Sequence, residues 1–275
     1  RFGNEPTYSS SEYKDIVYSI FTSGSTGKPK QVLISVDNLN NHQQALTSAL
    51  KLTHQDKVLH CCSLSFDVSI EEVLTTLNAG ATVVILAALE NTSMQALNDF
   101  IAHHSISIAN LPTAIWNNWV DILMLGTVHP PKSLKTIVIG SEACPVSSFN
   151  HWQSLDYQDI TMINAYGLSE TTITNSLWPF KECGKSHTKC IPIGKPIAGN
   201  EFFIVDDNDR FVDNGNSGEL VITGQQIGCY SSTSELSKKS GFITLTDHSG
   251  QKKKAFRTGD IARINQDGDY EILAR

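Results

Sequence analysis

The sequence predicts an α/β protein with mostly parallel sheets flanked by helices, followed by a smaller β-barrel-like subdomain. From about residue 16 to residue 175, short β-rich apolar runs alternate with longer amphipathic runs. Beyond residue 178, short strands separated by turn residues take their place. The 275 residues, 40% of them hydrophobic, suffice for a full core in about two structural units. We therefore expect one unit at residues 1–178 and a β-rich subdomain at residues 179–275.

The first unit is expected to alternate strands and helices. Its strand-like runs are Ile16–Phe21, which reads as a buried strand, Val58–Leu64, Thr82–Leu86, Ile106–Ala109, Thr136–Ile139 and Thr161–Asn164. The predicted helices are Leu39–Leu50, Ile70–Leu77, Ser93–His104, Thr113–Met124 and Val146–Trp152. Such alternation implies parallel strands, and ligands collect at the carboxyl ends of parallel strands. We therefore expect one rim to carry the segments Thr22–Lys30, Ser65–Asp67, Gly140–Glu142 and Ala165–Gly167.

The second unit is expected to consist mainly of short strands. They are predicted at Ile191–Pro196, Glu201–Val205, Gly218–Gly224, Asp260–Ile264 and Asp269–Leu273, with one helix at Ser232–Ser240. The dipeptide Asp267-Gly268 lies between two alternating runs and predicts a β-hairpin. A β-barrel or sandwich-like arrangement accommodates this pattern.

Charge and apolar patterning exclude two classes of partner. A net charge of −7 argues against a nucleic-acid-binding surface, and the basic run Lys252–Lys254 is typical of a solvated turn. The longest apolar stretch, Ala79–Leu89, is far shorter than the ~18 residues of a membrane-spanning helix. The first residues do not resemble a signal peptide. We expect neither nucleic acid nor a membrane among the partners.

Cysteine usage predicts a cytoplasmic protein. The six cysteines form no C-x-x-C motif, which is typical of a reducing compartment. Cys183, His187 and Cys190 could together ligate a metal, but their spacing matches no zinc pattern, so we do not expect one there. The chain does not start with Met, and we expect it to be a fragment.

A loop rich in hydroxyl groups directly follows the first predicted strand. The stretch Phe21-Thr22-Ser23-Gly24-Ser25-Thr26-Gly27-Lys28-Pro29-Lys30 contains four hydroxyl side chains, two glycines and two lysines. Exposed backbone N–H groups, hydroxyls and ammonium groups suit a polyanion such as a nucleotide triphosphate. The glycine spacing does not fit G-x-x-x-x-G-K-[ST], because Gly24 and Gly27 are only three residues apart. The loop is therefore a phosphate-binding candidate, with an ordinary solvated loop as the alternative.

Four further motifs follow this loop in order. They are Asn164-Ala165-Tyr166-Gly167-Leu168-Ser169-Glu170-Thr171-Thr172, Gly218-Glu219-Leu220-Val221-Ile222-Thr223-Gly224, Phe256-Arg257-Thr258-Gly259-Asp260 and Ile272-Leu273-Ala274-Arg275. From about Tyr18 onward, the motifs resemble the adenylate-forming, AMP-binding superfamily, and most closely the amino-acid adenylation domains of nonribosomal peptide synthetases. The resemblance implies part of the large domain of such an enzyme.

The resemblance implies an ATP-dependent ligase. Such enzymes join a carboxylate to the α-phosphate of ATP, release pyrophosphate and pass the acyl group to a thiol. The attack on phosphorus needs charge neutralisation more than a covalent nucleophile. The implied cofactors are ATP and Mg²⁺, with phosphopantetheine only on a partner carrier domain. The implied partners are an amino acid or other small carboxylic acid and a carrier-protein domain, with a condensation domain in the same polypeptide left open.

The resemblance also implies roles for individual residues of an ATP site. The phosphates would be held by Thr22, Ser23, Gly24, Ser25, Thr26, Gly27, Lys28 and Lys30. Tyr166 would lie flat against adenine, with Gly140, Ser141, Glu142, Asn164, Ala165, Gly167, Ser169 and Thr171 around the nucleotide. Glu170 would hold Mg²⁺ as a hard oxygen ligand and, with Lys30, act in catalysis. Asp260 would accept both ribose hydroxyls, and Arg275 would approach the ribose.

A second set of residues would hold the acid. Ser65-Phe66-Asp67-Val68-Ser69 resembles the stretch in which amino-acid-activating members place an aspartate against the substrate ammonium, a partner that would compensate a buried Asp67. The positions that line the side-chain pocket in the family can be counted from the shared motifs. In this sequence they correspond to Val68, Glu71, Asn110, Ile137, Ile139, Ala165, Ile173 and Thr174. Among them, Glu71 and Asn110 indicate a polar or cationic substrate side chain.

Each of these residues also has a structural alternative. Tyr166 could be a core aromatic, Glu170 could cap a helix, and Arg257–Asp260 could be a plain turn. Asp67 could be the N-cap of the helix that follows, and Glu71 could face solvent. The ordered set of motifs favours the functional interpretation of the ATP site.

The chain departs from the family pattern in two positions and in extent. Leu168 stands where many synthetase domains have proline, and Ala274 where a glycine often precedes the arginine. We expect the family's N-terminal part and its small C-terminal domain, with the lysine that contacts carboxylate and phosphate, to be absent. Residues 1–275 alone are therefore expected to adenylate slowly or not at all. An acyl- or aryl-CoA ligase and a non-catalytic nucleotide-binding remnant remain open as alternatives.

Overall fold

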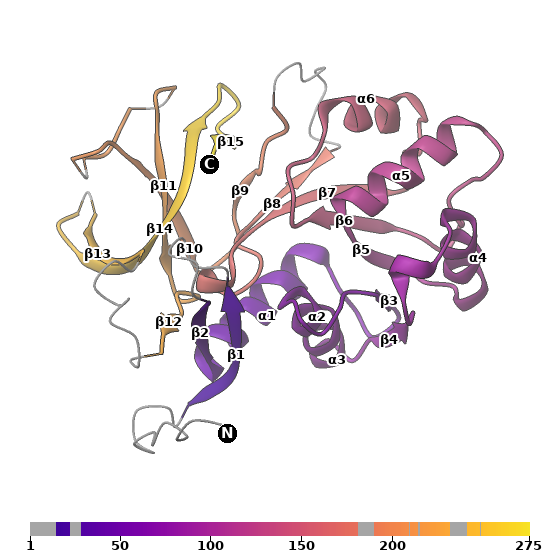
Figure 1. The fold of residues 1–275 in the computed structure, drawn as a ribbon, viewed down its shortest axis with the longest axis horizontal. Coiled ribbons are helices and arrows are strands. Elements are labelled where there is room, and N and C mark those ends of the chain that lie inside the picture. Colours follow the sequence, from indigo (N-terminus) through magenta and orange to yellow (C-terminus); the bar gives the residue numbers. More distant parts are fainter. Residues whose placement is uncertain are drawn as a thin grey trace.

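Three β-sheets and the helices around them make up the part of the chain that the structure describes (Figure 1). The structure, a computed structural model, describes residues 15–22, 29–180, 190–208, 210–213, 215–231, 241–247 and 249–275. The loop residues Ser23–Lys28, the position of Cys183 and His187, and the predicted helix Ser232–Ser240 lie outside these ranges. The α/β class expected from the sequence is confirmed.

The largest sheet has seven strands in the order β4-β3-β5-β6-β7-β8-β9. Its parallel strands are β3 (Lys57–His60), β4 (Thr82–Ile85), β5 (Ile108–Pro112), β6 (Thr136–Gly140) and β7 (Thr161–Tyr166). Two antiparallel strands extend it, β8 (Ser176–Pro179) and β9 (Lys195–Pro196). Compared with the prediction, β3 ends four residues earlier and β5 lies further along the chain, so that Asn110 is a strand residue.

Helices cover both faces of this sheet. They are α1 (Val36–Leu50), a continuous segment made of α2 (Val68–Ile70), π-helical η1 (Glu71–Thr75) and α3 (Thr76–Asn78), the 3₁₀ turns η2 (Leu89–Asn91) and η3 (Ser169–Thr171), and α4 (Met94–His104), α5 (Thr113–Met124) and α6 (Val146–Ser154). The main core lies between the sheet and α4–α6 and contains Trp116, Trp119, Phe149 and Trp178, none more than 1% exposed. None of the helices described is long and apolar enough to cross a membrane.

The strand before the hydroxyl-rich loop does not belong to the parallel sheet. β1 (Ile16–Thr22) pairs antiparallel with β2 (Lys30–Ser35), and β2 pairs with β12 (Cys229–Tyr230). The prediction that β1 is a buried strand of the parallel sheet is therefore wrong, and its residues are alternately half-buried and exposed. Only seven residues separate Thr22 from Lys30, which is too short for a parallel crossover. The apolar run Val32-Leu33-Ile34 was the signal for β2 that the sequence analysis missed.

The third sheet is antiparallel and contains the remaining strands. They are β10 (Asn200–Val205), β11 (Ser217–Gly224), β13 (Phe242–Thr246), β14 (Lys252–Ile264) and β15 (Tyr270–Ala274). The hairpin predicted at Asp267-Gly268 is confirmed, since β14 and β15 pair around it. Lys252–Lys254 begin the strand β14 rather than a turn, and Lys253 pairs with Glu201 and Asp247. In Figure 1 this sheet stands beside the end of the seven-stranded sheet at which β7 ends.

Candidate functional site

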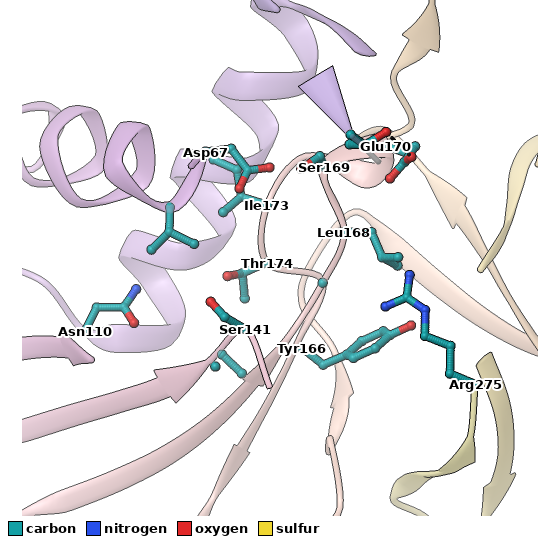
Figure 2. Close-up of a pocket in the computed structure, with 15 residues that line it drawn as sticks. Asp67, Asn110, Ser141, Tyr166, Leu168, Ser169, Glu170, Ile173, Thr174 and Arg275 are labelled. Carbon is teal, nitrogen blue, oxygen red and sulfur yellow. Dashed lines mark hydrogen bonds between the residues drawn. The ribbon is translucent and has the colours of Figure 1, made fainter. Parts of the chain in front are cut away.

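A pocket of about 280 Å³, which we call the central pocket, opens where the three sheets meet. Figure 2 shows it, with Asn110 at one end and Arg275 at the other. Its lining residues are Thr22, Asp67, Val68, Asn110, Gly140, Ser141, Ala165, Tyr166, Gly167, Leu168, Ser169, Glu170, Ile173, Thr174 and Arg275. All except Leu168 had been predicted as site residues, so the structure brings half of the predicted set together in this pocket.

Tyr166, Asp260 and Arg275 form a polar cluster at one end of the central pocket. The Tyr166 hydroxyl donates to Oδ2 of Asp260 at 2.6 Å, and Nε of Arg275 lies 3.5 Å from Oδ1. Burial and the adjacent Asp260 carboxylate raise the pKa of Tyr166 well above its usual value, which keeps the phenol a donor. Asp260 is 4% exposed, and Thr258 Oγ1 accepts from its backbone N–H. Asp260 is thus a buried residue of the strand β14 whose carboxylate accepts a hydrogen bond, so the plain-turn alternative is wrong.

A wider hollow of about 800 Å³, the outer hollow, shares several residues with the central pocket. Among its lining residues are Ser141, Glu142, Asn164, Ala165, Tyr166, Gly167, Asp260 and Arg275. Asn164 is 4% exposed, and its side-chain amide donates to the carbonyl of Pro192 at 2.7 Å, so it also anchors the strand end. Tyr166 borders both spaces, and its ring is therefore accessible to a flat ligand.

Glu170 lies in the turn η3 directly after β7. Its Oε1 accepts hydrogen bonds from Thr22 Oγ1 at 3.2 Å and from the Tyr230 hydroxyl at 3.1 Å. These bonds join residues of β1 and β12, so the carboxylate does not serve as a helix cap for its own turn. Lys30 does not line the central pocket, but its Nζ lies 5.2 Å from the centre of the Tyr230 ring. Glu170 thus faces the side of the pocket where the hydroxyl-rich loop begins.

Glycine is required at position 167 by a close backbone approach. A Cβ atom there would lie 1.7 Å from the carbonyl oxygen of Ile173. The chain turns back on itself through Thr172 and Ile173, whose φ angles of 61° and 67° are left-handed. The prediction that Thr171 contacts the nucleotide is wrong, because this residue is fully buried. Its hydroxyl forms hydrogen bonds with Leu168 and Asn175 inside the turn. Its role is to hold the turn that presents Glu170.

Asp67 begins α2 and is only 8% exposed. Its side chain makes no N-cap hydrogen bond, and Oδ2 is buried without a partner in the described part of the chain. Burial raises the pKa of Asp67, a side-chain hydrogen bond with Ser169 opposes the rise, and Glu71 adds to it. A buried carboxylate oxygen without a partner is costly, so the N-cap alternative does not account for this residue. The group is suited to a cation that enters the pocket.

Glu71, Asn110 and Thr174 line a smaller space of about 30 Å³, which we call the inner cavity. Its other lining residues are Leu46, Leu50, Leu52, Val58, Glu72, Thr75, Thr76, Ile108 and Val138. Asn110 and Thr174 line both this cavity and the central pocket, so the two spaces adjoin. The alternative in which Glu71 faces solvent is wrong, because the residue is 4% exposed.

Ile137 and Ile139 do not line the pocket as predicted. Both are fully buried in the core with α4–α6, on the opposite face of β6. Successive side chains of a strand point to opposite faces, so an error of one residue in the offset exchanges the faces. Val138, in the inner cavity, and Gly140, in the central pocket, are the β6 residues on the pocket side.

Sequence reasoning also missed residues that complete the site from other elements. Tyr230 on β12 binds Glu170, and the buried hydroxyl of Tyr18 on β1 lies in the field of Asp67 and Glu71. His42 on α1 bonds Glu71. No motif marks these residues, and only the tertiary structure brings them to the site. In the residues described, no cluster of three or more His, Cys, Asp or Glu side chains could hold a metal ion by itself.

Comparisons with known proteins concern the family and the fold. Residues 3–228 match the family model described as AMP-binding enzyme. Bacitracin synthase 3 of Bacillus licheniformis is 34% identical over 262 residues, which cover 95% of the chain. The chain spans only 4% of the length of that synthase and 23% of the length of gramicidin S synthase 1 of Brevibacillus brevis, to which it is 30% identical.

Solved structures share the fold. The N-terminal subdomain of Klebsiella oxytoca NpsA, in complex with 3-hydroxyanthranilyl-AMSN, superposes with a TM-score of 0.81 at 25% identity. The superposition covers 100% of this chain and 68% of that chain. NpsA-ThdA, an artificially fused adenylation–PCP di-domain NRPS from the same organism, gives 0.81 at 25% identity and covers 100% and 53% of the two chains.

Proposed function

The chain belongs to the AMP-binding enzyme family, and we propose on this premise that it contributes the binding site of an enzyme that activates an amino acid with ATP. The product would be an aminoacyl-adenylate, with pyrophosphate released. One observation carries the proposal: Asp67, a buried carboxylate with an unpartnered oxygen, lines the same pocket as Glu170 and Tyr166. A site that combines a nucleotide end with a carboxylate for an ammonium suits ATP and an amino acid together.

The polar cluster suits the nucleoside. We assign adenine to the face of Tyr166, beside Gly140, Ser141 and Glu142, and the ribose hydroxyls to Asp260, with Arg275 nearby. A carboxylate that already accepts from one hydroxyl in a desolvated position is pre-oriented for a diol. Ala165, Gly167 and Ser169 would contact the nucleotide. Asn164 would hold the end of β7 in place through its hydrogen bond to the carbonyl of Pro192.

The phosphates would lie toward the opposite side, near Thr22 and Glu170. We assign the β and γ phosphates to Thr22, Lys30 and the loop Ser23–Lys28, since hydroxyl and ammonium donors suit a polyanion. Glu170 offers a carboxylate that two hydroxyls hold in place, and it would bind Mg²⁺. Bound there, Mg²⁺ would neutralise phosphate charge.

The chemistry needs positioning and charge neutralisation. A carboxylate oxygen of the amino acid would attack the α-phosphorus, and the bond from that phosphorus to the oxygen bridging the β-phosphate would break. Both electrons of that bond would leave with pyrophosphate. Asp67 would hold the α-ammonium group, which fixes the direction of the attacking carboxylate. Val68, Ile173 and Thr174 would line the space for the side chain.

In a second step the phosphopantetheine thiol of a carrier-protein domain would attack the acyl carbon, and the bond to the phosphate would break with release of AMP. The likeness to the NpsA-ThdA di-domain supports a carrier domain as the partner. Coenzyme A is the competing acceptor, and the unpartnered Oδ2 of Asp67 favours the amino-acid enzyme over a CoA ligase. Mass spectrometry of a carrier domain and of coenzyme A after incubation with ATP and substrate decides between the two acceptors.

ATP–pyrophosphate exchange in the full-length protein tests the activation step. We expect Asp67→Ala to reduce kcat/KM for the preferred amino acid by about 100-fold or more, because a buried charge pair is lost. Asp99→Ala is the matched control, since this exposed carboxylate of α4 bonds only Gln95 among the residues described, and it should leave exchange unchanged. Exchange that is insensitive to Asp67→Ala would contradict the assignment, and no exchange with any acid would favour a non-catalytic remnant.

A further inference from the structure

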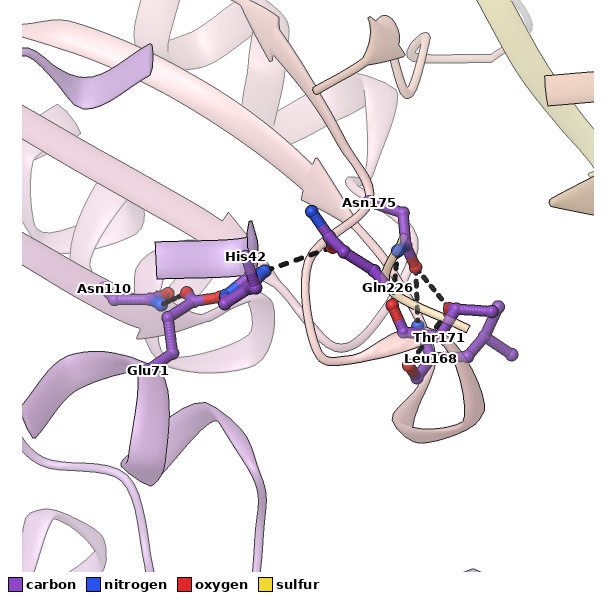
Figure 3. A network of polar contacts seen from close by, with 7 residues as sticks. All are labelled: His42, Glu71, Asn110, Leu168, Thr171, Asn175 and Gln226. Atoms are coloured by element: carbon purple, nitrogen blue, oxygen red, sulfur yellow. Dashed lines mark hydrogen bonds and ion pairs between the residues drawn. The ribbon is translucent and has the colours of Figure 1, made fainter. Parts of the chain in front are cut away.

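Four polar side chains from four elements, three of them buried, form a chain that ends in the inner cavity (Figure 3). Nδ1 of His42 lies 3.3 Å from Oε1 of Gln226, and Nε2 of His42 lies 2.9 Å from Oε2 of Glu71. The amide of Asn110 donates to Oε1 of Glu71 at 3.2 Å. These residues come from α1, the β11–β12 connection, η1 and β5, so the position of the Glu71 carboxylate depends on the whole fold.

The charge of Glu71 is not balanced by a permanent cation. Its ion-pair partner in the described residues is His42, and no lysine or arginine there lies within ion-pairing distance of it. A carboxylate that is 4% exposed is costly unless it is paired.

The hydrogen bonds of His42 are compatible with an imidazole that carries no charge. The amide nitrogen of Gln226 is buried and has no partner among the residues described. Exchanging the oxygen and nitrogen of this amide leaves its shape unchanged, lets the nitrogen donate to Nδ1 of His42 and leaves the oxygen in the position without a partner. In that arrangement His42 is neutral and donates from Nε2 to Glu71. The histidine then orients the carboxylate without neutralising it.

Asp67 and Glu71 are positioned to bind two cationic groups of one molecule. The N–H of Glu71 donates to the carbonyl of Asp67 at 3.2 Å, so the two residues are one helical turn apart. Side chains at this spacing lie on the same helix face, with Cβ atoms about 5–6 Å apart. The hydroxyl of Tyr18 lies in the field of both carboxylates. One carboxylate, that of Asp67, therefore lines the central pocket, and a second one, that of Glu71, lines the adjoining inner cavity.

The inner cavity has the size and lining for the end of an unbranched chain. Its volume of about 30 Å³ holds one water-sized group. Val58, Ile108 and Val138 supply apolar walls that suit methylene groups. Oε1 of Glu72 and Oγ1 of Thr75 are buried and unpartnered in the described part of the chain, and both residues line the cavity. The carboxylate of Glu71, the carboxyl oxygen of Glu72 and the hydroxyl of Thr75 provide acceptors for an ammonium group in this cavity.

We propose that the preferred substrate is an α,ω-diamino acid with about three or four methylene groups, whose distal ammonium binds Glu71 and the amide oxygen of Asn110 while its α-ammonium binds Asp67. This inference rests on the proposed amino-acid activation and adds the substrate class. His42 and Gln226 are positioning residues that act through Glu71.

Pyrophosphate exchange by the full-length protein tests the proposal. Ornithine and lysine are compared with norvaline and norleucine, which lack the distal charge, and with glutamine, which ends in a neutral amide. We expect kcat/KM to be at least about 100-fold higher for the diamino acids, the effect of breaking a buried ion pair. Exchange that is fastest with glutamine or norleucine would overturn the substrate class and leave the activation proposal standing. No exchange with any acid would instead count against activation itself.

Two variants separate charge from positioning. Glu71→Gln keeps the shape of the side chain and one acceptor oxygen, and it should remove the preference for diamino acids while glutamine or norleucine still supports exchange. His42→Gln should raise KM for the diamino acid at least about tenfold with kcat nearly unchanged, because the carboxylate loses its orientation. Asp99→Asn on α4 is the folding-neutral control. A Glu71→Gln enzyme that keeps the full preference for diamino acids would refute the proposal.

Discussion

At the scale of single residues, several side chains of the site carry charge in places that water does not reach. Asp67, Glu71 and Glu72 lie within six positions of one another and are each at most 8% exposed. Glu72 accepts from Nδ1 of His60 at 2.6 Å and from the backbone amides of Cys61 and Cys62. Burial nevertheless raises the pKa of Glu72 to about 8, with a smaller contribution from Glu71. Three acidic side chains in one helical segment therefore make this region sensitive to pH.

The raised pKa of Glu72 predicts a stability that falls as pH rises. The folded state holds this proton up to a pKa of about 8, whereas the unfolded state releases it near 4.5. The free energy of unfolding should therefore decrease between about pH 4.5 and pH 8. Glu72→Gln cannot ionise, and it should flatten this part of the profile in urea unfolding at a series of pH values. An unchanged slope in the variant would contradict the buried, protonated state of Glu72.

At the scale of elements, the turn after β7 is the most constrained part of the site. It contains Gly167, two consecutive left-handed residues, and the buried bonds between Thr171 and Asn175. Because of this geometry, Tyr166 and Glu170 lie on different sides of the central pocket. The motif Tyr-Gly-x-Ser-Glu-Thr-Thr thus encodes a backbone path as much as a set of ligands.

Gly167→Ala should be strongly destabilising. Its Cβ would overlap the Ile173 carbonyl, and the backbone of both segments would have to move, at a cost of about 2–4 kcal/mol in the free energy of unfolding. Gly126→Ala is the matched control: Gly126 has a φ of 69° and no atom within 4 Å of an added Cβ. The control should cost only about 1 kcal/mol for its backbone strain. Equal losses in the two variants, measured by chemical unfolding, would show that the close approach is unimportant.

At the scale of the whole molecule, residues Gln225–Gly228 tie the sheets together at the site. The side-chain amide of Asn38 on α1 donates to the carbonyl of Gln225 at 2.7 Å, and the N–H of Gly228 donates to the carbonyl of Glu170 at 2.9 Å. The hydroxyl of Thr172 donates to the carbonyl of Gln226 at 2.6 Å. One connection thereby joins the antiparallel sheet to the turn that carries Glu170 and to the helix that carries His42.

Removing the Thr172 hydroxyl should loosen this connection. Thr172→Val leaves the buried Gln226 carbonyl without its donor, and we expect faster amide hydrogen exchange at Gly228 and a loss of about 1–2 kcal/mol in local stability. Thr172→Ser retains the hydroxyl and serves as the control. Protection at Gly228 that is the same in all three proteins would show that the bond does not hold the connection.

The sequence was informative where local pattern and order suffice. Alternating apolar runs predicted α1 and α4–α6 and the parallel strands, because each buries one face with a fixed period. The ordered motifs placed Thr22, Tyr166, Glu170 and Arg275 around one pocket. The prediction that β1 belongs to the parallel sheet was wrong, because an apolar run does not show whether its partner strand is parallel or antiparallel.

The sequence by itself determined the family and the residue types that meet at strand ends, since these follow from local periodicity and motif order. Only the tertiary structure decided that Val138 rather than Ile137 and Ile139 faces the pocket, because a strand reverses face at every residue. It alone decided that Glu71 is buried and meets His42, 29 positions away, and that His42 meets Gln226, 184 positions away. Contacts of this kind depend on how distant elements pack, and no local signal in the chain encodes them.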